Sequence, residues 1–137
     1  FLETASKNVD NSKHTKEVTS TKENEIISTL KVENEKERNT KITELQTILT
    51  KKDATSEEKN NAYEELKTIN ILKGKEEEIS TKIKDELKLE NFVKIKDDQV
   101  RVVVIKENQD AKLATDIMNL VQSNFDSKMY ISIKFQK

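Results

Sequence analysis

The sequence predicts an α+β fold with the order αββαβ, in which a three-stranded sheet packs on two helices and a helical extension precedes it. Three observations lead to this fold. Apolar residues are dense only from Asn91 to the end of the chain, where short segments rich in β-branched residues or alternating with period two predict strands. A helically spaced segment separates the second and third of these strands. Upstream, apolar residues are sparse and have helical spacing.

The strands are predicted at residues 91–96, 99–106 and 129–135. Asp97-Asp98 is a turn signal between the first two, so we expect a hairpin there. A right-handed crossover through a helix at 110–125 makes the third strand parallel to the second. The expected strand order is therefore 1-2-3.

Period-two alternation assigns the two faces of the sheet. One face is the predicted core, with Val102 on the central strand. The other face carries an apolar set among charges, and a partly apolar surface of this kind is typical of protein contacts. The predicted partner-binding residues are Phe92, Arg101, Val103, Ile105, Tyr130, Ser132 and Lys134. The third strand is an unprotected edge to which a partner strand can add. In the alternative, a helix at 21–50 folds back and covers this face.

The N-terminal part is expected to be less committed to structure. Residues 1–20 have no apolar stripe and predict a disordered tether, following a removed membrane anchor. A helix is expected over 21–50, with a polar stretch at 33–41 that projects into solvent. Thr55 and Glu58 form a predicted capping box for a second long helix. Gly74, the single glycine, predicts a kink that divides a helical extension (21–74) from the αββαβ domain (75–137).

The composition argues against an enzyme. The chain of 137 residues has no cysteine, one glycine and one histidine, which excludes thiolate chemistry and glycine-rich phosphate loops. Carboxylate runs such as residues 76–78 are interpreted as solvated charges. We predict no catalytic residue, cofactor or metal site. A net charge of −1 gives no basic footprint, so nucleic-acid binding is not expected; a KH-like binder would also need a GXXG loop.

Several stretches resemble the stage III sporulation protein AH family of endospore-forming bacteria. They are the runs Lys52 to Lys59, Ala62 to Leu66, Phe92-Val93, Asp98 to Val102 and Ala114 to Phe125, together with the closing strand. The resemblance covers about residues 21–137. It implies a ring-building motif like those of secretion-system rings. It further implies a membrane anchor in the outer forespore membrane, with the soluble domain in the intermembrane space between mother cell and forespore.

The resemblance also implies a partner, stage II sporulation protein Q, and a structural role in a sporulation channel, with homo-oligomerisation into a ring. A helical scaffold or adaptor remains the alternative, in which the helices of residues 21–89 carry the function. Sustained heptads would favour that alternative, and the polar stretch at 33–41 argues against it.

Overall fold

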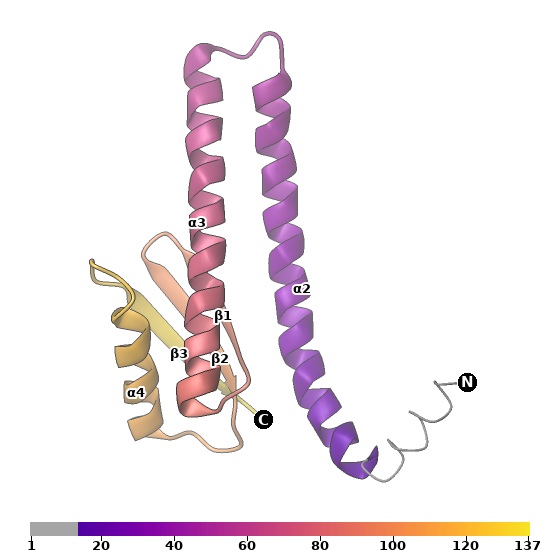
Figure 1. Cartoon of the computed structure of the whole chain (residues 1–137), viewed down its shortest axis with the longest axis vertical. Helices are drawn as coiled ribbons and strands as arrows, with labels where there is room; N and C mark the ends of the chain where they lie inside the picture. The colour runs from indigo at the N-terminus through magenta and orange to yellow at the C-terminus, as the bar shows by residue number, and fades with distance from the viewer. Residues whose placement is uncertain (1–13) are drawn as a thin grey trace.

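The computed structural model describes the backbone of residues 14–137 and the side chains from residue 25 onward. The elements in chain order are α2 (His14–Thr50), α3 (Ser56–Leu87), β1 (Asn91–Lys96), β2 (Gln99–Ile105), α4 (Ala111–Gln122) and β3 (Tyr130–Gln136). From α3 onward this order is αββαβ, which confirms the predicted fold class (Figure 1).

The three strands form one sheet in the order β1-β2-β3. β1 and β2 are antiparallel and form a hairpin, with Val93 opposite Val102. β3 is parallel to β2, with Val102 opposite Ile133. The crossover runs through α4, which begins at the N-cap Asp110, whose side chain accepts a hydrogen bond from the backbone N–H of Leu113. The predicted order and strand directions are therefore confirmed.

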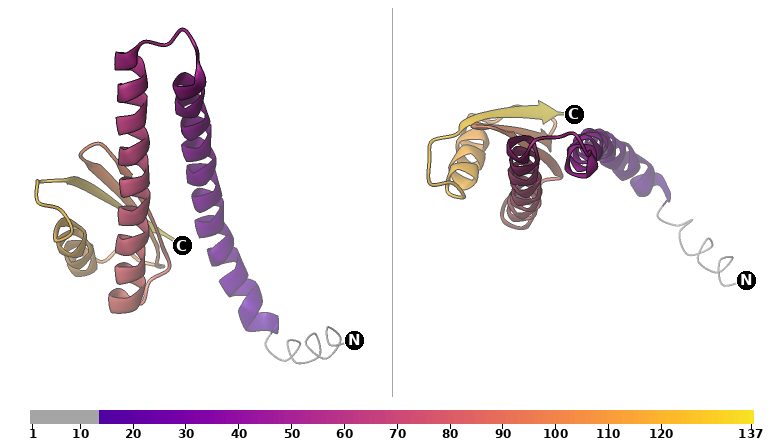
Figure 2. Two further views of the ribbon diagram at one scale, coloured as in Figure 1. Left: turned by 45° about the horizontal axis from the view of Figure 1, so that its top comes forward. Right: turned by 90° about the horizontal axis from the view of Figure 1, so that it is seen from above.

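The main core lies between one sheet face and the helices α3 and α4, which lie side by side against it (Figure 2). Val102 and Val104 of β2 are fully buried, as are Ile79 and Ile83 of α3. Ile117 and Val121 of α4 are also fully buried. A central strand buried in this way needs apolar residues on its inner face, and the β-branched run of β2 supplies them.

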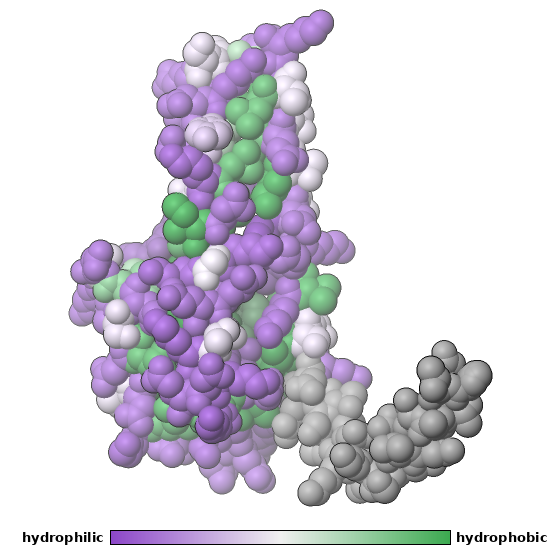
Figure 3. All heavy atoms as spheres, viewed as in Figure 1, coloured by the Kyte–Doolittle hydropathy of each residue, from purple (hydrophilic) through white to green (hydrophobic). Residues whose placement is uncertain are grey.

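α2 and α3 form a long antiparallel hairpin that extends well beyond the sheet (Figure 1). At its tip, Thr55 caps α3, and the reciprocal bonds with Glu58 complete the predicted capping box. α3 has 32 residues, so it is roughly 48 Å long at 1.5 Å per residue. Leu45 of α2 and Ala62 of α3 are buried in the part of the hairpin beyond the sheet. Figure 3 shows apolar residues gathered between the two helices there.

The kink predicted at Gly74 is wrong, because α3 is one uninterrupted helix from Ser56 to Leu87. A glycine inside a helix costs about 1 kcal/mol relative to alanine, but it does not by itself change the helix direction. The apolar stripe keeps the same phase on both sides of Gly74, and Leu72 and Ile79 both pack on the core. That packing outweighs the local preference of the glycine.

α2 begins at His14, earlier than the helix start expected near residue 21. Residues 14–20 of the predicted tether are therefore helical, because a helix that has already formed adds one hydrogen bond for each further residue. Residues 1–13 lie outside the described part of the chain, so the tether remains a prediction for them. No helix among the described residues is long and apolar enough to cross a membrane.

Candidate partner-binding surface

The predicted partner-binding residues fall into two groups in the structure. Phe92 and Val103 are buried, and together with the half-buried Ile105 they pack against Ile27 and Leu30 of α2. α2 therefore covers this part of the face, as the alternative interpretation of the helix at 21–50 stated. These three residues do not lie on an open surface of this structure.

The four remaining predicted residues, Arg101, Tyr130, Ser132 and Lys134, are exposed. Together with Lys94 and Lys96 of β1 they form an open surface, which we call the basic face. Cross-strand register places Lys94 opposite Arg101, and Arg101 opposite Ser132. Tyr130 is 62% exposed. Lys94 is partly neutralised, because its ammonium group lies 2.9 Å from a Glu37 carboxylate oxygen. That contact lowers the pKa of Glu37.

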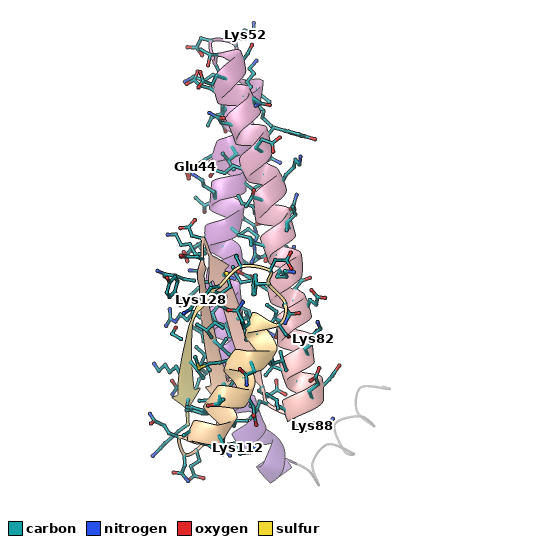
Figure 4. The ribbon with its side chains drawn as sticks, turned by 90° about the vertical axis from the view of Figure 1, so that its left-hand side faces the viewer. Glu44, Lys52, Lys82, Lys88, Lys112 and Lys128 are labelled. Atoms are coloured by element: carbon teal, nitrogen blue, oxygen red, sulfur yellow. The ribbon has the colours of Figure 1, made fainter. Side chains whose placement is uncertain are left out.

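A cavity of about 580 Å³ adjoins the basic face where β3 begins. Lys96, Lys128 and Tyr130 line it, together with Met118 of α4 and Met129. Figure 4 shows Lys128 beside the start of β3, on the loop that follows α4. Cations around an aromatic ring and flexible methionine side chains suit an acidic, partly apolar protein surface.

β3 is an edge of the sheet, and its outer backbone groups face away from β2. The amide of Tyr130 donates to the carbonyl of Asp98, just before β2, at 2.8 Å. Because successive amides of a strand point in opposite directions, those of Ile131, Ile133 and Phe135 point outward. The side chains of these three residues are only half-buried, although they pack on the core. A partner strand at this edge would form hydrogen bonds with the outward amides and would complete the burial of the three side chains.

At the opposite edge, β1, an outward backbone amide is bonded to a buried carboxylate. Glu76 of α3 is 8% exposed, and its Oε2 accepts a hydrogen bond from the backbone N–H of Ile95 at 2.9 Å. Its Oε1 accepts from Asn34 at 3.0 Å and from Arg38 at 2.7 Å, both on α2. Burial raises the pKa of Glu76 above its ordinary value, and this effect outweighs the lowering by the Ile95 amide, Arg38, Asn34 and Lys94.

Sequence reasoning missed Glu76, because residues 76–78 were interpreted together as solvated charges. That interpretation is wrong for Glu76, while Glu77 and Glu78 are exposed. Its position in the stripe with Leu72, Ile79 and Ile83 would have indicated burial. The polar stretch at 33–41 does not project freely into solvent either, because Arg38 on its inner side contacts Glu76. Asn34 and Arg38 of this stretch face Glu76 and donate hydrogen bonds to its carboxylate.

The arrangement offers backbone hydrogen bonds, charge and one exposed aromatic ring. The described residues include no group of three or more histidine, cysteine or acidic side chains placed to hold a metal ion. The surface is thus suited to protein contact by strand addition and by electrostatic complementarity.

Comparison with known proteins agrees with this picture. The family model of SpoIIIAH-like proteins matches residues 2–133, so the chain belongs to the SpoIIIAH-like protein family. A chain in the solved "Structure of the SpoIIQ-SpoIIIAH pore forming complex" is similar to it at 25% identity, with a TM-score of 0.73. The match covers 81% of this chain and 96% of that one. The comparison with curated proteins gave no match.

Proposed function

We propose that this protein is a non-enzymatic assembly module of a sporulation complex and that its partner is SpoIIQ, stage II sporulation protein Q. The observation that carries the proposal is the match, over almost the full length of a chain, to the SpoIIQ–SpoIIIAH pore-forming complex. Membership of the SpoIIIAH-like family supports it independently. The module acts outside the cytoplasm, in the space between mother cell and forespore. There it is tethered to the outer forespore membrane by a segment that precedes this chain.

The proposed interface is the outer edge of β3 together with the basic face. Two kinds of interaction meet there: outward amides for main-chain pairing, and Lys96, Arg101, Lys134 and Tyr130 for side-chain contacts. Oligomerisation into a ring, as part of a channel, is the further step of this proposal. The outer edge of β3 and the basic face lie side by side, so one strand of the partner can contact both.

Tyr130 is proposed as an anchor of the interface, because an exposed aromatic side chain buries a large area on binding. Tyr130→Ala should weaken SpoIIQ binding by about 1–3 kcal/mol, with little loss of fold. Tyr63, which is 55% exposed on the α2–α3 hairpin, supplies the matched control Tyr63→Ala. Isothermal titration with the extracytoplasmic domain of SpoIIQ measures both variants. Equal affinities for folded Tyr130→Ala and Tyr63→Ala would remove Tyr130 from the interface.

The helical adaptor is the competing function, with partner contacts on the α2–α3 hairpin rather than on the sheet. It predicts the opposite ranking, with Tyr63→Ala the weaker binder. A KH-like role predicts salt-sensitive micromolar binding of single-stranded RNA to the basic face. We expect no such binding at physiological salt, where a fluorescence anisotropy titration would reveal it.

A further inference from the structure

We propose that Glu76 of α3 blocks the β1 edge by binding both the backbone of β1 and the side chains of α2, so that a partner strand can add only at β3. This inference rests on the proposed function, because it explains why one of the two sheet edges serves assembly. Glu76 is a positioning residue in this account: it acts on the backbone of β1 and on α2, and it makes no contact with the partner.

The first support is the geometry of the carboxylate. Its two oxygens bond to two different elements: Oε2 accepts from the Ile95 amide on β1, and Oε1 from Asn34 and Arg38 on α2. The Ile95 amide points away from β2, since β1 is an edge strand and this N–H donates to α3 instead of the ladder. A partner strand at β1 would need this same amide.

The second support is that, among the described residues, no buried apolar contact holds α2 at this level, where the other links are the more exposed ion pairs Lys94–Glu37 and Lys73–Glu35. Cavities of about 280 Å³ and 570 Å³ flank the Glu76–Arg38 pair, and both are lined by Asn34, Arg38 and Glu76. The apolar contacts of α2 lie further along the helix, at Ile27 near one end and Leu45 towards the other. A buried ion pair is weak as a source of stability, but it fixes one arrangement of the elements that it joins.

The third support is the consequence of leaving β1 open. β1 is antiparallel to β2 and β3 is parallel to β2, so β1 and β3 run in opposite directions. The β3 edge of one copy could meet the β1 edge of the next as an antiparallel pair, and this head-to-tail junction can repeat from copy to copy. Exposed edges of this kind lead to uncontrolled association. With β1 closed, β3 is left for a different partner.

The test removes the carboxylate in the full chain. Glu76→Ala should accelerate hydrogen exchange of the Ile95 amide about tenfold, whereas Glu77→Ala, its exposed neighbour, should not. Glu76→Ala should also sediment as concentration-dependent oligomers, and adding Ile131→Pro should return it to the state of the Glu77→Ala control. Proline at 131 removes an outward amide of β3 without breaking its pairing with β2.

The inference is overturned if folded Glu76→Ala matches Glu77→Ala in exchange and sedimentation. It is also overturned if the oligomers persist with Ile131→Pro, since association would then use the uncovered Phe92 and Val103. Should Glu76→Ala not fold, as judged by circular dichroism, Glu76→Met, which fills the space but has no oxygen to accept from the Ile95 amide, is assessed by the same criteria. Ile131→Pro alone separates the two proposals: unchanged SpoIIQ affinity in that variant would count against strand addition at β3, and not against closure of β1.

Discussion

At the scale of single residues, Glu76 shows why a charge can be placed in a packed interface. Its side chain faces three hydrogen-bond donors, and all three lose a partner if it is removed. Desolvation nevertheless raises its pKa above the ordinary value of 4.5. A carboxyl group with a raised pKa in the folded state stabilises the fold most below its unfolded pKa. That stabilisation is lost as the pH rises through the folded value.

The pH dependence of stability follows from the upward direction of the Glu76 pKa shift. The free energy of unfolding of the wild-type protein, relative to Glu76→Gln, should increase as the pH is lowered from 7 towards 4.5. Urea unfolding at several pH values measures the difference, and Glu77→Gln corrects for the loss of one carboxylate from α3. A difference that decreases on acidification would mean that Arg38 and the hydrogen bonds outweigh burial.

At the scale of elements, the sequence predicts strands and helix caps well, because local chemistry determines them. The turn at 97–98 and the capping box at Thr55 lie where the residue pattern predicts. What local patterns could not predict is how α2 docks. Its polar stretch looks solvated until Glu76, far along the chain, is placed opposite Arg38. For the same reason, the sequence pattern predicts that Phe92 and Val103 are open, although α2 covers them.

Gly74 gives a test at this scale. A Cβ built at this position meets no atom within 4 Å, and the residue lies inside a continuous helix. Gly74→Ala should therefore raise the free energy of unfolding by about 0.5–1 kcal/mol, through the lower entropy of the unfolded chain. Urea denaturation with an unchanged m-value measures this effect. Destabilisation would indicate that α3 needs the flexibility of glycine, as the predicted kink implied.

At the scale of the whole molecule, the fold leaves one sheet edge covered and one open. α2 and α3 lie at the β1 side, and β3 has no neighbouring strand on its outer side within the described residues (Figure 2). The basic face adjoins the open edge, while the tip of the α2–α3 hairpin extends well beyond the sheet (Figure 1). The sequence alone predicts β3 as an edge, but only the three-dimensional arrangement shows that an outward amide of β1 is bonded to Glu76.

The most direct test of the central claim is amide hydrogen exchange of this chain with and without the extracytoplasmic domain of SpoIIQ. The account predicts new protection of the amides of Ile131, Ile133 and Phe135, which point outward from β3, and no change at Ile95, which is already bonded to Glu76. Protection confined to the tip of the α2–α3 hairpin, with these three amides unchanged, would contradict it.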